Sequence, residues 1–167
     1  TTIEVRDAVS TPYIDMTLET LERFGVEVMH NEGDYSEFYI EGNQILKPVD
    51  YTIESDWSRA AAMMVAAAIA GEVTIRNIST LSHQADTSIC RALERVGASI
   101  IIEQDSITVA HRELEAFDFD ATNSPDLFPV LVALAAAADG VSEIKGIGRL
   151  RGKESDRGEV LRSEYKK

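Results

Sequence analysis

The segment Gly152–Arg157 carries four charged side chains whose types suit anion binding and proton transfer. Lys153 and Arg157 are cations, and Glu154 and Asp156 are carboxylates. If a helix begins here, the two cations lie one turn apart on the same face, where like charges repel. An anionic ligand would relieve that repulsion, and a helix N-terminus already offers amide donors to a phosphate. The simpler alternative is a solvated helix start whose carboxylates interact favourably with the helix dipole.

The distribution of charge along the chain points to a small anion. The net charge of −13 argues against nucleic acid or an anionic membrane as a partner, because such binding needs clustered cations. Five of the sixteen lysines and arginines nevertheless fall within thirteen residues: Lys145, Arg149, Arg151, Lys153 and Arg157. A local cationic cluster on an acidic protein is a candidate site for a small anion.

Two other stretches hold polar side chains that could belong to a site. Asp126 follows Asn123-Ser-Pro, and its spacing alone predicts a helix cap, like Asp56 about 70 residues earlier. Ser10-Thr-Pro-Tyr13 precedes a helix predicted over residues 14–24. Its hydroxyl and phenol could cap and cover that helix, or could hydrogen-bond a phosphate or a sugar-like ring.

Several features limit the class of protein. The three histidines show no metal-ligand spacing, so we expect neither a metal site nor a cofactor. The single cysteine, Cys90, cannot form an internal disulfide and lies among apolar neighbours, which favours an inert thiol in a reducing compartment such as the cytoplasm. No segment is long and apolar enough to span a membrane, and no secretory leader is visible.

An internal repeat organises the chain. Leu21–Val28 and Leu93–Ile100 share the pattern Leu-Glu-Arg-apolar-Gly, and they lie 72 residues apart. Each predicts a helix that ends at a glycine in the left-handed conformation, followed by a hairpin. The turns of the two hairpins are expected at residues 31–34 and 104–106.

A second pair of segments gives the same period. Strands are predicted over 51–54, 73–76, 117–120 and 142–145, and helices run from Asp56 to Gly71 and from Asp126 to Gly140. These helices are apolar on nearly every face, so we expect them to be buried all round. The sequence therefore predicts an α/β (α+β) fold of repeated β-α-β-α-β-β units about 70 residues long.

The repeat is incomplete at both ends. The first copy begins part-way, and the hairpin that should follow Glu164 has no counterpart. We therefore expect the chain to be part of a longer protein; the alternative is a natural small domain with a frayed C-terminal helix.

Five motifs occur in an order that resembles a known family. They are Ser10–Thr17 (Ser-x-Pro-Tyr-Ile-Asp-x-Thr), Glu54–Ser58 (Glu-x-Asp-x-Ser), Ser82–Asp86 (Ser-x-Gln-x-Asp), Pro125–Asp126 and Lys153–Arg157 (Lys-Glu-Ser-Asp-Arg). Together they resemble the central part of the 5-enolpyruvylshikimate-3-phosphate synthase family, also called 3-phosphoshikimate 1-carboxyvinyltransferase. The resemblance covers essentially the whole chain, and Lys153–Arg157 is its most specific element.

The resemblance implies an enolpyruvyl transferase fold with two domains, each built from three repeats, and a substrate cleft between them. Residues 1–47 would be the C-terminal portion of the first domain. Residues 48–167 would be part of the second, with one full repeat at 51–110 and a truncated repeat at 116–167. The missing N- and C-terminal parts of the same protein would complete the site.

The resemblance also implies a reaction in the shikimate pathway of aromatic amino acid and chorismate biosynthesis. The enolpyruvyl group of phosphoenolpyruvate passes to the 5-hydroxyl of shikimate 3-phosphate, and phosphate is released. By this comparison, Asp126 bonds the sugar hydroxyls and acts as the base, and Glu154 is the second proton-transfer residue.

The remaining roles concern substrate binding. Ser10, Tyr13 and Lys153 resemble ligands of shikimate 3-phosphate, and Arg157 resembles a phosphoenolpyruvate ligand. Arg149 stands where some members carry asparagine, so the resemblance assigns it no role. Much of the family's site is absent, so we expect no turnover by this chain alone. The alternatives are the sister transferase acting on UDP-N-acetylglucosamine and a non-catalytic binding domain.

Overall fold

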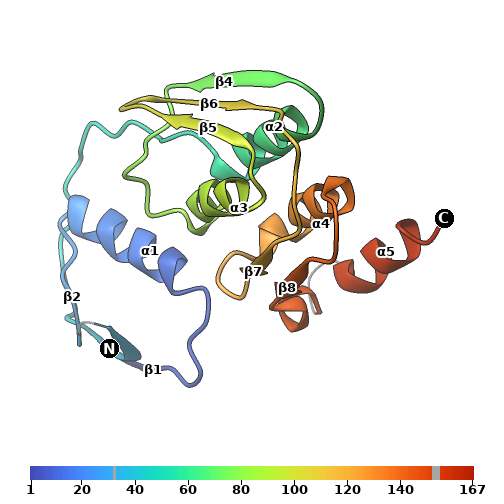
Figure 1. The fold of residues 1–167 in the computed structure, drawn as a ribbon. Helices are drawn as coiled ribbons and strands as arrows, with labels where there is room; N and C mark the ends of the chain where they lie inside the picture. Colours follow the sequence, from blue (N-terminus) through green and yellow to red (C-terminus); the bar gives the residue numbers. More distant parts are fainter. Residues whose placement is uncertain (32, 152–154) are drawn as a thin grey trace. The chain divides into compact units, whose positions relative to one another are not determined.

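The computed structural model describes residues 1–31, 33–151 and 155–167, which divide into two units, Thr1–Ile53 and Glu54–Lys167 (Figure 1). The first unit contains β1 (Thr2–Glu4), α1 (Thr11–Arg23), β2 (Val28–Asn31) and β3 (Asp34–Ile40). Its strands form an antiparallel sheet in the order β1-β3-β2.

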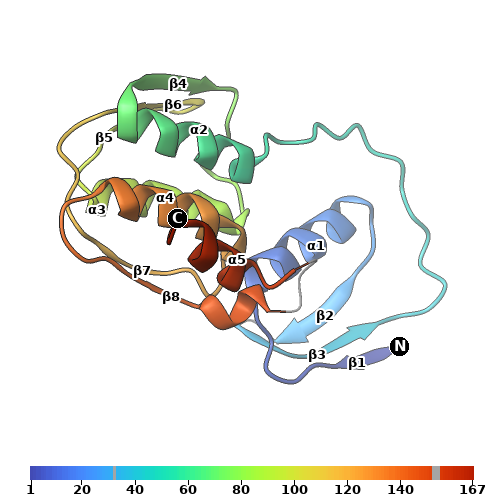
Figure 2. The same cartoon turned by 90° about the vertical axis from the view of Figure 1, so that its right-hand side faces the viewer.

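The second unit contains two successive, incomplete copies of the predicted pattern (Figure 2). Its first elements are α2 (Trp57–Ala70), β4 (Glu72–Arg76), the 3-10 helix η1 (Ala85–Ser88), α3 (Ile89–Arg95), β5 (Ser99–Ile102) and β6 (Ser106–Ala110). They are followed by β7 (Asp118–Asp120), the 3-10 helix η2 (Pro125–Leu127), α4 (Phe128–Ala137), β8 (Glu143–Lys145), the 3-10 helix η3 (Ile147–Leu150) and α5 (Arg157–Glu164).

The two units share a local topology, which confirms the sequence repeat. In the first unit, β1, α1 and the β2–β3 hairpin form a sheet in which the last strand lies between the other two. In the second, β4, α3 and the β5–β6 hairpin do the same, in the order β4-β6-β5. Both predicted hairpins are therefore present, each after its predicted helix.

The shared glycines end their helices as predicted. Gly25 and Gly97 have φ angles of 80° and 88°, in the left-handed region. In each copy the glycine N–H donates to the carbonyl three residues back, and the next N–H donates to the carbonyl of Leu21 or Leu93, five residues back. This pair of bonds satisfies carbonyls that the end of a helix leaves without a partner, and it turns the chain toward the following strand.

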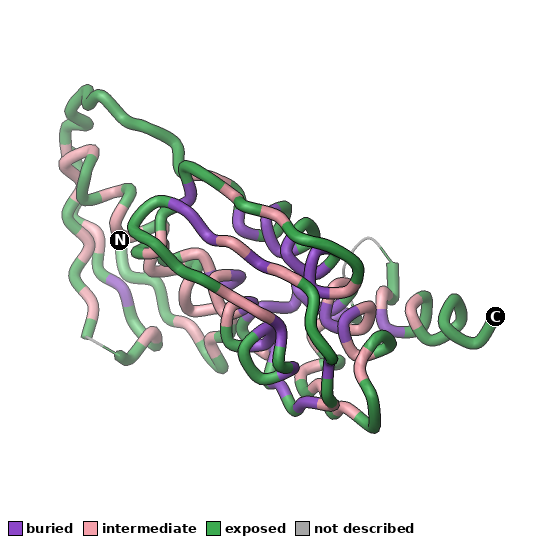
Figure 3. Tube along the Cα trace, turned by 45° about the horizontal axis from the view of Figure 1, so that its top comes forward, coloured by how far each residue is buried: buried purple, intermediate pink, exposed green. Residues whose placement is uncertain are grey.

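The hydrophobic core belongs to the second unit (Figure 3). Helices α2 and α3 lie on one face of the β4-β6-β5 sheet, and α4 packs against α2 (Figures 1 and 2). The alanines of α2 let these elements approach closely, around Met64 and Leu131, which are fully buried. Trp57, the single tryptophan, is 2% exposed at the start of α2. Strands β7 and β8, which α4 connects along the chain, pair in parallel with Phe119 opposite Ile144.

One face of α2 departs from the expectation of burial on every side. Ala62, Met63, Ala66 and Ala70 are exposed, and Met63 is 60% exposed. The opposite face carries the buried residues, so the helix has an apolar surface on both sides. A helix of this composition is normally covered all round, and in the described residues only one side of it is.

The strand predicted over residues 51–54 is absent, and the chain there has no regular structure. The ring of Tyr51 lies 6.2 Å from that of Phe24, and the Arg23 guanidinium lies 5.4 Å from the Tyr51 ring centroid. The Ser55 hydroxyl donates to the carbonyl of Asn77 at 2.6 Å. Aromatic contacts at one end and a side-chain hydrogen bond at the other therefore hold this segment in place of strand pairing.

Helix α4 ends at Ala137, three residues before the predicted Gly140. The chain leaves the helix because it pairs with an earlier segment. The N–H of Asp139 donates to Leu114, and its carbonyl accepts from Ala116, both at 2.8 Å. Gly140, with a φ of 106°, then turns the chain toward β8.

Two further features concern reactivity and membranes. Burial raises the pKa of the Cys90 thiol to about 11, with the nearby Glu94 carboxylate contributing, so the thiol stays protonated and unreactive at neutral pH.

In the described residues, no helix combines the length and the apolar character that a membrane crossing needs.

Replacement of Gly97 by alanine should lower the free energy of unfolding of the second unit by about 1 kcal/mol, because a Cβ disfavours the left-handed conformation. Urea unfolding followed by Trp57 fluorescence measures this. The matched control is Gly71→Ala, since Gly71 has an extended φ of −178° and an added Cβ would meet nothing within 4 Å. Equal losses in both variants would show that the backbone conformation of Gly97 is not what matters.

Candidate functional site

Asp126 lies in η2, the single turn that precedes α4. Ser124 stands at the N-terminal boundary of this turn, and Pro125 occupies its first position, where a missing N–H costs nothing. The predicted role of Asp126 as a helix cap is therefore wrong, because the residue lies inside the turn. Its carboxylate Oδ1 instead accepts a hydrogen bond from Nη1 of Arg157 at 2.8 Å.

The helix expected to begin within Gly152–Arg157 is α5, and Arg157 is its first residue. The carboxylate of Asp156 caps it by accepting from the N–H of Glu159 at 3.1 Å. Lys153 and Glu154 themselves lie outside the described residues.

The Asp126–Arg157 pair joins the starts of two helices of the second repeat. About a third of each side chain is exposed, 31% for Arg157 and 35% for Asp126, so water only partly screens the two charges. A cation at a helix N-terminus is disfavoured by the helix dipole. The carboxylates of Asp126 and Asp156 offset this cost and keep Arg157 at the entrance of α5.

Side-chain and backbone hydrogen bonds shape the turn before Asp126. The carboxylate of Asp120 accepts from the N–H of Thr122 at 2.9 Å. The Thr122 side chain and backbone both bond this carboxylate, and they lower the pKa of Asp120. The N–H of Ser124 then donates to the carbonyl of Ala121 at 3.1 Å. These bonds direct the chain from β7 into η2.

Two glycines bring η3 close to both halves of the pair. Gly146 has a φ of 99°, and a Cβ there would lie 2.7 Å from the backbone nitrogen of Thr122. Gly158 is buried, and its Cβ would lie 3.1 Å from Cγ1 of Ile147. Neither close approach was predicted from the sequence, where each position is a glycine outside any predicted turn or helix end.

The predicted cationic cluster is neutralised in part by acidic neighbours. The Nζ of Lys145 lies 3.9 Å from a carboxylate oxygen of Glu143, and both side chains are exposed. Arg149 is partly buried within η3, whereas Arg151 is exposed. Arg157, by contrast, pairs with Asp126, and its side chain is less exposed than that of Lys145.

Ser10 and Tyr13 belong to the first unit, whereas Asp126 and Arg157 belong to the second. Ser10 stands at the N-terminal boundary of α1 in a left-handed conformation, with a φ of 56°. Its carbonyl accepts from the N–H of Tyr13 at 3.0 Å, but its hydroxyl does not cap the helix, so the alternative of a hydroxyl cap is wrong. Tyr13 lines a shallow groove along α1 with Met16 and Thr17.

Comparison with known proteins agrees with this fold and motif order. The model of the family described as EPSP synthase (3-phosphoshikimate 1-carboxyvinyltransferase) matches residues 1–167. The chain belongs to this family.

Curated relatives in the EPSP synthase family lead to the same conclusion. The 3-phosphoshikimate 1-carboxyvinyltransferase of Clostridium botulinum is 40% identical over 156 residues, covering 93% of this chain and 36% of the relative. The enzyme of the same name from Colwellia psychrerythraea is 39% identical over 170 residues, covering all of this chain and 39% of the relative. The chain thus spans well under half the length of these relatives.

A solved EPSP synthase shows the same architecture. The structure from Acinetobacter baumannii superposes with a TM-score of 0.78 at 25% identity, over 98% of this chain and 38% of that one. The family and the enolpyruvyl transferase fold predicted from the motifs are therefore confirmed. The roles of individual side chains stay predictions, and of these side chains the structure brings Asp126 and Arg157 into contact.

Arg157→Ala should lower the free energy of unfolding of the second unit by about 1 kcal/mol, because it leaves the partly buried Asp126 carboxylate without this partner. Trp57 fluorescence during urea unfolding reports the change. Arg162→Ala is the control, since Arg162 pairs with Glu159 at 3.3 Å and both side chains are 64% exposed. That control should shift stability by less than about 0.3 kcal/mol. Equal free energies of unfolding for the two variants would mean that the Asp126–Arg157 pair does not stabilise the fold.

Proposed function

We propose that this chain is part of an enzyme that transfers the enolpyruvyl group of phosphoenolpyruvate to the 5-hydroxyl of shikimate 3-phosphate. Phosphate is the second product, and the reaction belongs to the shikimate pathway of aromatic amino acid biosynthesis. The observation that carries the proposal is the family match over all 167 residues, joined to the contact between Asp126 and Arg157. The relatives' name favours this reaction over transfer to UDP-N-acetylglucosamine.

Asp126 supplies the base in this proposal. The reaction needs a group that takes a proton from the attacking hydroxyl, and it needs cations that stabilise phosphate and carboxylate charge. A carboxylate that is a third exposed can reach a bound hydroxyl, and η2 presents it from the rigid start of α4. A substrate hydroxyl would donate to an oxygen of this carboxylate before losing its proton.

Arg157 supplies the anion contact. A guanidinium carries five N–H donors in a planar fork, so it can bind a carboxylate and a second anion in the same plane. A phosphoenolpyruvate oxygen bound at Arg157 shares the positive charge of the guanidinium with Asp126. Binding of phosphoenolpyruvate would then weaken the ion pair and leave Asp126 a stronger base toward the sugar hydroxyl.

The other predicted site residues complete the proposal. Ser10, Tyr13 and Lys153 bind shikimate 3-phosphate, and Glu154 is the second proton-transfer residue. No cofactor or metal is required by this chemistry. The substrates are small molecules, and we place the enzyme in the cytoplasm.

The proposal also concerns the rest of the protein. Residues 1–47 end the first domain, and residues 48–167 form part of the second. The chain covers 36% and 39% of its two relatives, so other parts of the same protein supply the remaining substrate contacts.

The decisive experiment assays the full-length protein that contains this chain. With phosphoenolpyruvate and shikimate 3-phosphate, it should release phosphate and form the enolpyruvyl ether, detected by mass spectrometry. Asp126→Ala should lower kcat by at least about 100-fold, the range expected on loss of a general base. The 167-residue chain alone should release no phosphate above this variant.

Substitution of UDP-N-acetylglucosamine for shikimate 3-phosphate serves as the specificity control and should give no product. Product with the nucleotide sugar but not with shikimate 3-phosphate would contradict the proposed acceptor. Full activity of Asp126→Ala would contradict the role of the carboxylate.

A further inference from the structure

The segment Gln84–Ser88, which comprises η1 and the residue before it, holds two other segments of the second unit. Side chains at alternate positions, Gln84, Asp86 and Ser88, each bond a different partner. The partners lie 27 to 36 residues away along the chain, so these bonds are tertiary and not local. We call this segment the η1 clamp.

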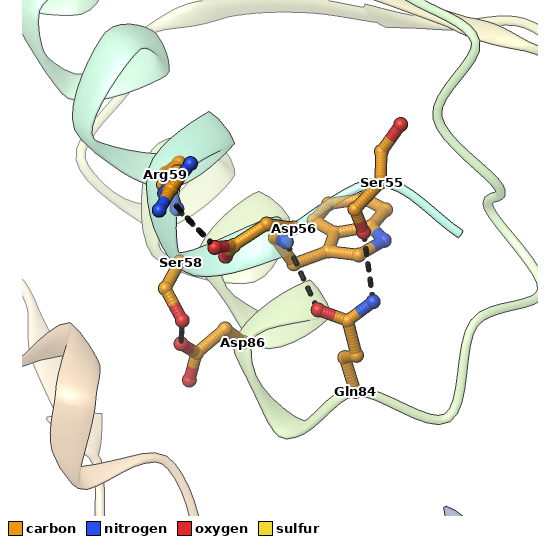
Figure 4. Close-up of polar contacts among 7 residues, drawn as sticks. Ser55, Asp56, Ser58, Arg59, Gln84 and Asp86 are labelled. Atoms are coloured by element: carbon orange, nitrogen blue, oxygen red, sulfur yellow. Dashed lines mark hydrogen bonds and ion pairs between the residues drawn. The ribbon is translucent and has the colours of Figure 1, made fainter. Parts of the chain in front are cut away.

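Three bonds hold the start of α2 (Figure 4). The amide of Gln84 donates to the carbonyl of Ser55 at 2.8 Å and accepts from the N–H of Trp57 at 3.0 Å. The Asp86 carboxylate, 1% exposed, accepts from the hydroxyl of Ser58. Because Trp57 is itself buried and its indole N–H donates to Ser79, the clamp rests on a rigid part of the core.

A fourth bond leads to the turn that carries Asp126. The Ser88 hydroxyl donates to the hydroxyl of Ser124 at 3.3 Å, and Ser124 is only 3% exposed. Ser124 does not use its side chain to cap η2; its carbonyl accepts from the N–H of Leu127 at 3.1 Å. This part-buried hydroxyl contact therefore connects the first repeat to the backbone on both sides of Asp126.

We propose that Ser88 is a positioning residue for Asp126, acting through Ser124. The inference rests on the proposed function, in which Asp126 must meet a substrate hydroxyl. Ser88 itself contacts no reacting group. A displacement of about 1 Å at a catalytic carboxylate can cost up to roughly 100-fold in rate, so a bond that holds η2 against the core affects the chemical step.

The experiment compares Ser88→Ala with Thr74→Val in the full-length protein. Thr74 and Thr108 form a hydroxyl–hydroxyl contact at 2.9 Å between β4 and β6, so each variant removes one such bond within the same unit. Ser88→Ala should lower kcat about tenfold and change the KM for phosphoenolpyruvate less than about twofold. Thr74→Val should leave both parameters within about twofold of the unaltered enzyme.

Two further measurements separate positioning from a loss of stability. Ser88→Thr keeps the hydroxyl and should restore most of kcat. Hydrogen exchange of the peptide spanning residues 122–128 should be faster in Ser88→Ala and unchanged in Thr74→Val, because the Leu127 amide loses protection when η2 loosens. This second readout does not depend on activity, so it tests the link to η2 even if the unaltered protein uses other substrates.

The outcomes are distinct. A tenfold loss of kcat with faster local exchange and rescue by threonine supports the proposal. Unchanged kcat, a loss that threonine does not rescue, or unchanged exchange at 122–128 overturns it. Ser124→Ala removes the acceptor of the same hydrogen bond and should reproduce the loss of kcat. This variant keeps the test valid if Ser88→Ala folds poorly. Inactivity of the unaltered enzyme toward shikimate 3-phosphate would instead reject the proposed function.

Discussion

The ion pair between Asp126 and Arg157 is the constraint around which the second repeat is arranged. It holds a carboxylate and a guanidinium 2.8 Å apart at the starts of two helices, with about a third of each side chain exposed to water. Neither residue is well placed by local preference. Asp126 lies inside a turn and does not cap a helix, and Arg157 occupies a helix start where the dipole disfavours a cation. Each position is therefore explained by the other residue, and both suit a site that must hold an anion and accept a proton.

The two repeats of the second unit place a polar contact at equivalent points. In the first, the Ser58 hydroxyl bonds the buried Asp86 carboxylate, joining the start of α2 to the turn before α3. In the second, Asp126 bonds Arg157, joining the turn before α4 to the start of α5. The first contact contains no cation, and its carboxylate is buried. The second is an ion pair open to solvent, and so it can serve a ligand. One repeat architecture thus provides a structural junction in one copy and a candidate site in the other.

The sequence predicted the features that local physics determines. The glycine ends of α1 and α3 and the hairpins after them follow from residues within a few positions of one another, and all are present. The family followed from five motifs in order, and the comparisons confirm it. The helix expected within Gly152–Arg157 begins at the last of these residues, where Asp156 caps it. The η1 clamp was missed although Ser82–Asp86 was among the motifs. Its bonds reach residues 27 to 36 positions away along the chain, and a local sequence pattern does not predict such distant partners.

The most direct test of the central claim is a double-mutant cycle on Asp126 and Arg157 in the full-length protein. Asp126→Asn, Arg157→Lys and the double variant are compared by kcat/KM for shikimate 3-phosphate at saturating phosphoenolpyruvate. If the two side chains act as one unit, each single change costs about 100-fold and the double variant is within about threefold of the worse single one. Losses that multiply to roughly 10,000-fold would show that the two residues act independently, and would contradict an account built on their pairing.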